Sequence, residues 1–150
     1  MSHAYVRQQF RAAVQLVLPP LGFQWFESIN LATRTQNLPR RWYSMEFLGA
    51  DDQPITLGVP QLNRETGTCS VQIYTEQQIT DEAGTDAAET LREAFALWHD
   101  VSGHLRITEC EPATDVDGGD FRGSFYGLAV GLRYSFDHFV TYSPILEVPP

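Results

Sequence analysis

Apolar positions recur every three to four residues near the start of the chain. Over residues 3–18 this period predicts an amphipathic helix. The apolar stripe consists of Val6, Phe10, Val14 and Val17, widened by Ala13 and Leu18. Ser2 is suited to cap the helix, and Pro19 and Pro20 follow where the helix must end. Within the irregular stretch that follows, we expect Phe23, Trp25 and Phe26 to cover the core.

Other stretches alternate between apolar and polar residues, which predicts half-buried strands. The alternation is clear over residues 41–49, 67–76 and 105–108, and over a long last strand from Phe125 to about Phe136. Residues 55–59 are either a short strand or a loop arm. Between the strands we expect a turn at residues 50–54, an exposed polar loop at 60–66 that holds Arg64 and Glu65, and a turn-rich loop at 113–120.

A second apolar stripe predicts another helix between these strands. Asp86, with Glu89 three residues later, fits a capping box at its start, and Gly103 fits a terminator just beyond its end near residue 99. The element order is then helix, two or three strands, helix, two strands. It favours a single α+β domain over residues 1–150, with a mainly antiparallel four- to five-stranded sheet and two helices packed on one face.

Charge and cysteine content exclude several classes of protein. The chain holds 10 basic and 19 acidic residues, a net charge of −9, which argues against sequence-specific nucleic-acid binding. No apolar run is long enough to span a membrane, and from the N-terminal residues we expect no secretory signal. Cys69 is therefore expected to be a reduced core residue, and Cys110 to be reduced and partly exposed.

The stretch DVDGGD offers the best candidate for a metal site. Asp115, Asp117 and Asp120 are carboxylates at short spacing, which suits a hard cation such as calcium. The stretch has Tyr126 where an EF-hand requires glutamate, and aspartate and glycine are also ordinary turn residues. A solvated turn and a calcium site both remain open, and the turn is the simpler reading.

The sequence contains no recognisable catalytic motif. It has no glycine-rich phosphate loop and no GxSxG. His99 and His104 have poor spacing for metal ligands, and Asp137 cannot easily orient His138 because neighbours in a strand point to opposite faces. The pattern favours a binding or structural protein that needs no cofactor over an enzyme, although residues distant in sequence can still converge.

Three longer stretches carry a family resemblance. They are INLATRTQNLPRRW at 29–42, TLGVPQLNRETGTCSVQIYTE at 56–76 and GLAVGLRYSFDHF at 127–139, with the helix LREAFALW at 91–98 between them. Together they span most of the chain, which resembles the tail terminator proteins of long-tailed bacteriophages and prophages.

The resemblance implies a structural role without catalysis. Such proteins form a hexameric ring on the head-proximal end of the tail tube, stop tube polymerisation and offer a surface to head-completion proteins. Partners would be other copies of the chain, the tail tube protein and a neck protein, in a virion tail assembled in the bacterial cytoplasm. The related alternative is a head–tail connector or neck adaptor.

A ring subunit needs two different contact patches because its interfaces are head-to-tail. Beyond the expected end of the last strand lie Phe139, Tyr142, Ile145 and Leu146, which either meet a neighbour or cap the domain's own core. The loop with Arg64 and Glu65 either contacts the tube or a neighbour or is an idle surface loop.

The acidic balance suggests a further use, because DNA leaves the head through the tail. A positively charged lumen would retain DNA. We therefore expect Asp51, Asp52 or the carboxylates Asp115, Asp117 and Asp120 to line the ring's channel.

Overall fold

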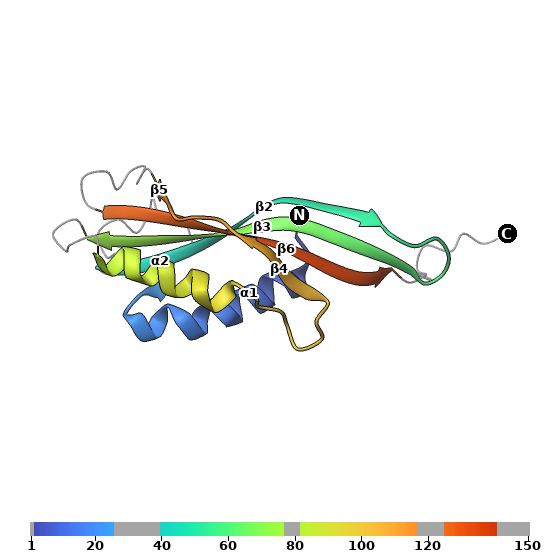
Figure 1. Ribbon diagram of the computed structural model, residues 1–150, viewed down its shortest axis with the longest axis horizontal. Coiled ribbons are helices and arrows are strands. Elements are labelled where there is room, and N and C mark those ends of the chain that lie inside the picture. Colours follow the sequence, from blue (N-terminus) through green and yellow to red (C-terminus); the bar gives the residue numbers. More distant parts are fainter. Residues whose placement is uncertain (1, 26–39, 77–81, 117–124, 141–150) are drawn as a thin grey trace, which may run out of the picture.

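The protein is built as a long twisted sheet with both helices against one face (Figure 1). The computed structural model describes residues 2–25, 40–76, 82–116 and 125–140. The elements in chain order are α1 (Ala4–Val17), the 3-10 helix η1 (Pro19–Leu21), β1 (Gln24–Trp25), β2 (Arg41–Pro54), β3 (Gln61–Glu76), α2 (Glu82–Phe95), β4 (Leu105–Cys110), β5 (Thr114–Val116) and β6 (Phe125–Val140).

The strands lie in the order β1-β2-β3-β6-β4, with β5 also paired to β6. β1 is parallel to β2, and the other pairings are antiparallel. The predicted α+β class and mainly antiparallel sheet are confirmed, but the sheet has six strands instead of four to five. The additional strands, β1 and β5, have two and three residues, too few for alternation to reveal them.

The core lies between the helices and the sheet face that they cover. Phe10 of α1 is fully buried, with its ring centroid 6.0 Å from that of Phe95 and 5.4 Å from that of Tyr134. Cys69 and Phe23 are buried as predicted, and burial raises the pKa of the Cys69 thiol. Cys110 is partly exposed, also as predicted.

Both helices have starting points different from those predicted. His3, not Ser2, caps α1, and its side chain accepts a hydrogen bond from the Tyr5 amide. Asp86 lies inside α2, so the predicted capping box is wrong, and α2 ends at Phe95 instead of near residue 99. A Cβ added to buried Gly84 would lie 3.6 Å from Thr75, so close packing on the sheet already begins before Asp86.

β2 and β3 are longer than predicted and project past the helices (Figure 1). The turn expected at 50–54 is strand, and the loop expected at 60–66 is strand from residue 61 onward. A register shift between Leu48 and Asp51 breaks the period of two on which the prediction depended. We call residues 51–64 and the adjoining residues 137–140 of β6 the arm.

Two tyrosine rings lie across glycines of a neighbouring strand. Tyr134 covers Gly67, where an added Cβ would lie 2.8 Å from the tyrosine oxygen. On the other face, Tyr74 covers Gly127, where an added Cβ would lie 2.9 Å from the ring. Only glycine therefore lets these rings lie flat on the sheet at both places.

Candidate functional site

Arg64 and Glu65 lie on opposite faces of β3 and not in an exposed loop. Glu65 points to the helix side and is only 4% exposed. Arg64 points to the open face of the sheet, where no helix lies. The prediction of an exposed loop is therefore wrong for both residues, because a strand pairs with β2 and β6 on its two sides here.

Glu65 joins the start of α1 to the base of the arm. Its carboxylate accepts a hydrogen bond of 2.9 Å from the His3 backbone N–H and another of 2.9 Å from the Tyr134 hydroxyl. The N-terminus of a helix stabilises a carboxylate through its free N–H groups and its dipole. Burial, together with the bond to Glu65, raises the pKa of Tyr134. This arrangement holds the helix layer against the sheet and has a structural role.

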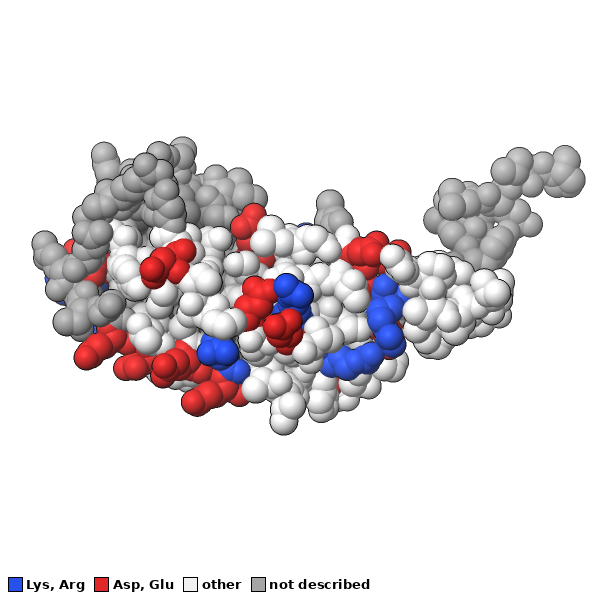
Figure 2. Space-filling view, turned by 45° about the horizontal axis from the view of Figure 1, so that its top comes forward, with Lys and Arg blue, Asp and Glu red and all other residues white. Residues whose placement is uncertain are grey.

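An ion-pair cluster lies on the open face at the root of the arm. Arg64 binds both carboxylate oxygens of Asp137, at 2.6 and 3.0 Å, and Arg106 of β4 approaches the same carboxylate at 3.5 Å. The hydrogen bond from Arg64 lowers the pKa of Asp137, although partial burial opposes the change. In Figure 2 a blue group of basic side chains lies beside the white end of the molecule.

His138 contacts a different carboxylate from the one next to it in sequence. Its ring nitrogen lies 3.0 Å from Asp52, on the helix side, and its ring stacks on Phe136 at a centroid separation of 5.3 Å. Asp137 binds the two arginines on the other face. The expectation that Asp137 does not orient His138 is confirmed.

The far end of the arm exposes a cluster of apolar side chains. We call it the apolar tip, and it consists of Ile55, Leu57, Val59, Phe139 and Val140. Leu57 is 97% exposed and Phe139 is 59% exposed. The ten residues from Gln53 to Leu62 carry no charge, and this end of the molecule is white in Figure 2. Such a surface is typical of a site that binds another protein.

Phe139 belongs to β6, opposite Leu62, and does not lie beyond the strand as expected. β6 continues to Val140 because β3 pairs with it along its full length. The other three residues of the predicted contact, Tyr142, Ile145 and Leu146, lie outside the described residues. Of these four predicted contact residues, the structure therefore describes Phe139 alone, and Phe139 is part of the apolar tip.

The acidic candidates lie in two separate places. Asp51 and Asp52 lie in the arm, whereas Asp115 lies in β5 and accepts a 2.8 Å hydrogen bond from the Tyr126 hydroxyl. Asp117 and Asp120 lie outside the described residues. Within the described ranges, no three histidine, cysteine or acidic side chains come together to hold a metal ion.

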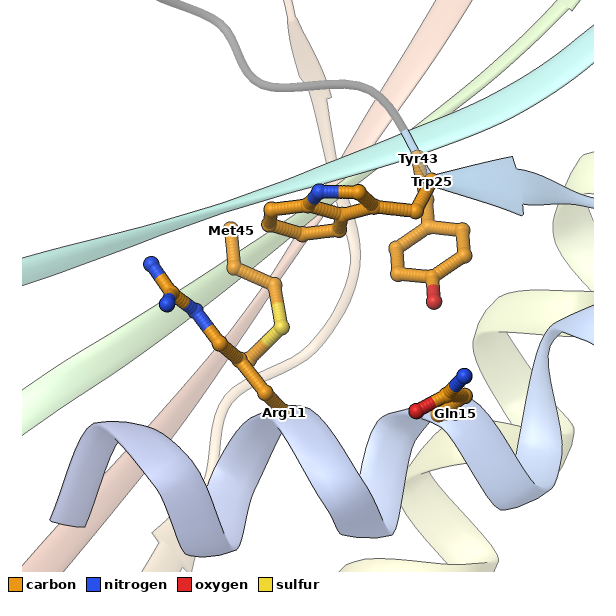
Figure 3. Close-up of a pocket in the computed structure, with 5 residues that line it drawn as sticks. All are labelled: Arg11, Gln15, Trp25, Tyr43 and Met45. Carbon is orange, nitrogen blue, oxygen red and sulfur yellow. The ribbon is translucent and has the colours of Figure 1, made fainter. Parts of the chain in front are cut away.

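A groove opens between α1 and the β1–β2 edge of the sheet (Figure 3). We call it the α1–β2 groove; its cavity of about 180 Å³ is lined by Arg11, Gln15, Trp25, Tyr43 and Met45. Trp25 remains 36% exposed, so it does not simply cover the core as expected. Sequence reasoning missed the groove because three separate elements build it.

The Arg11 guanidinium lies over the Trp25 ring, with its central carbon 5.8 Å from the ring centroid. This contact holds a positive charge at the rim while leaving the sulfur of Met45 and the Tyr43 ring facing the cavity (Figure 3). The groove therefore presents an apolar floor and a cationic edge, which suits an apolar side chain that arrives beside an acidic one.

No protein-family model matches the chain, and no curated protein matches its sequence. No helix in the described part of the chain is long and apolar enough to cross a membrane.

Proposed function

We propose that the chain is a structural subunit of a phage or prophage tail, which assembles as a ring on the head-proximal end of the tail tube and stops tube growth. The apolar tip is the observation that carries this proposal. An exposed group of Leu57, Val59 and Phe139 on a projecting arm is stabilised when another protein buries it. The tail-terminator resemblance supplies the setting for that partner.

The polar root of the arm supports an assembly role in a second way. At the root of the arm, the ion pair Arg64–Asp137 joins β3 to β6 on the open face, and His138–Asp52 joins β6 to β2 on the helix side. They fix the direction of the arm before any partner is bound. A pre-organised contact surface loses less conformational entropy on assembly.

The first test is the length of tails in particles that lack this chain, measured by electron microscopy. Overlong, variable tubes without heads are expected, because nothing would stop polymerisation. Tubes of normal length that do not join heads would contradict the terminator role and identify a neck adaptor instead. Normal, infectious particles would contradict both.

A point variant makes the same test specific to the arm. Phe139→Asp places a charge in the apolar tip and is expected to give the overlong tubes. Leu97→Asp is the matched control, since Leu97 is 93% exposed in the turn after α2 and outside the arm. Equal tail lengths in both variants would contradict a contact through the tip.

The acidic lumen is a separate part of the proposal. Asp51 and Asp52 lie on the arm, and Asp115 lies on β5. Replacing Asp51 and Asp115 by lysine is expected to slow DNA ejection in low salt, because the channel would then attract phosphate. An unchanged ejection rate would exclude these carboxylates from the channel wall.

A further inference from the structure

We propose that Leu57 of one copy inserts into the α1–β2 groove of the next copy, and that this contact joins neighbouring subunits. The inference rests on the ring proposed above and names the two surfaces that would build it. One surface is the apolar tip, and the other is the groove lined by Trp25, Tyr43 and Met45.

The Leu57 side chain is presented by an ordered turn. The Ile55 N–H donates to the Leu62 carbonyl oxygen at 2.8 Å, and the Leu62 N–H donates to the Thr56 hydroxyl at 2.8 Å. Gly58 takes a φ of 117°, which only glycine adopts readily. These bonds close the loop at its base, so that Leu57 projects from a fixed platform.

The groove has the size of one apolar side chain. Its cavity is about 180 Å³, and an apolar cavity of roughly 150 Å³ holds a benzene molecule. A leucine side chain therefore fits, with Ile55 and Val59 left to cover the rim. Gln15 and Arg11 remain at the edge, where they stay hydrated.

The tip of one molecule does not reach its own groove. Pro54, at the base of the loop, is opposite Asn63, whereas Met45 in the groove is opposite Val71. Eight residues of strand separate these positions, which corresponds to roughly 26 Å along the sheet. Figure 1 shows the arm and the end of α1 that follows Gln15 at opposite ends of the molecule. The contact must therefore be head-to-tail, and repetition of such a contact closes a ring or builds a filament.

Charge complementarity favours the same pairing. The charged side chains of α1 are Arg7 and Arg11, both basic. The arm carries three carboxylates, Asp51, Asp52 and Asp137, but one arginine, Arg64, so with histidine neutral its net charge is negative. The net negative arm of one copy therefore attracts the basic α1 of another, whereas two arms or two copies of α1 would bring like net charges together.

Disulfide trapping in the full chain tests the contact. Leu57→Cys and Gln15→Cys are combined with Cys110→Ser; Cys69 can stay because it is fully buried. Oxidation is expected to give a ladder of covalent multimers, because each copy has one tip and one groove and can therefore be linked to two neighbours. Each single-cysteine variant should give no ladder, and Leu97→Cys with Gln15→Cys is the matched control for random collision.

A quantitative variant accompanies the trapping. Leu57→Ser is expected to weaken self-association, measured by analytical ultracentrifugation, by about tenfold to a hundredfold per contact, the range for burying one leucine side chain. Leu97→Ser should leave it unchanged. Absence of a ladder, dimers only, or an equal ladder from the Leu97 pair would overturn the proposal.

The outcomes separate this contact from the ring function. Overlong tails in particles lacking the chain, together with no ladder, would leave the terminator role intact and exclude the Leu57 contact. A ladder together with normal tails would confirm the contact and exclude the terminator role.

Discussion

Replacing Tyr134 by phenylalanine tests whether a buried carboxylate holds α1 to the base of the arm. The substitution removes the hydroxyl that donates to Glu65 over 2.9 Å and keeps the ring that covers Gly67. Tyr134 is 1% exposed, so water does not readily replace the lost donor. A hydrogen bond to a charged group contributes about 1.5–3 kcal/mol. We therefore expect the free energy of unfolding to fall by about 2 kcal/mol.

Thermal unfolding gives the most direct measurement of this change. An unfolding entropy of about 2.1 cal/mol/K per residue corresponds to roughly 0.3 kcal/mol/K for a chain of this length. A loss of about 2 kcal/mol should then lower Tm by about 6 °C. Urea unfolding should show a lower midpoint with an unchanged m value, because the surface exposed on unfolding stays the same.

Repeating the Tyr134→Phe substitution in a Glu65→Leu variant tests whether the stability loss comes from the Glu65 carboxylate. In Glu65→Leu, the same tyrosine substitution should cost much less, because no carboxylate is left without its donor. Tyr126→Phe is the control for losing a hydroxyl at an exposed hydrogen bond, and a change within about 0.5 kcal/mol is expected. An equal cost of Tyr134→Phe with and without Glu65 would refute the reasoning.

The remaining predictions concern pH, packing and calcium. Burial alone would raise the pKa of Asp100, but hydrogen bonds from Tyr5, Ser102 and backbone amides lower it overall; its stabilisation is thus present above about pH 3.9 and lost as pH falls below that value. The stability curves of Asp100→Asn and wild type should therefore converge in acid, and parallel curves would contradict this. Gly127→Ala should destabilise by about 1–3 kcal/mol in urea unfolding, because its Cβ would lie 2.9 Å from the Tyr74 ring. Gly84→Ala, where the added Cβ would lie 3.6 Å from its nearest neighbour, should stabilise the helix by up to about 1 kcal/mol. If both alanine variants changed the free energy of unfolding in the same direction, the packing argument would be contradicted. Calcium should leave Tm unchanged, whereas a calcium site at a hundred times its Kd would add about 2.7 kcal/mol.

Alternation predicted the strands well where one sheet face meets the helices. Cys69, Val71 and Ile73 face the core, as do the apolar residues of β6 opposite them. The arm escaped prediction because the helix-facing positions at its root are polar: Asp52 and, opposite it, Glu65 have hydrogen-bonding partners instead of apolar neighbours. The bulge after Leu48 also shifts the pairing, so a fixed period of two no longer applies.

The candidate contact surfaces could be predicted only in part. The aromatic residues near the end of the chain indicate Phe139 as a contact residue, and it is exposed in the apolar tip. The run ITLGVP carries a further signal for the tip, because it is an uncharged turn in which leucine stands next to glycine. The α1–β2 groove depends on tertiary packing of α1, β1 and β2, and no local pattern encodes it.

Polar residues at the root of the arm and apolar residues at its tip have different roles. Past the helix layer there is no core to bury, so the strands are joined by their backbone pairing, which the ion pairs Arg64–Asp137 and His138–Asp52 support at the root. Each exposed pair contributes little by itself, but together they keep the register that presents Leu57. An apolar tip on an exposed hairpin promotes aggregation unless a partner covers it. An ordered root with an uncovered tip therefore supports the assembly contact that we propose.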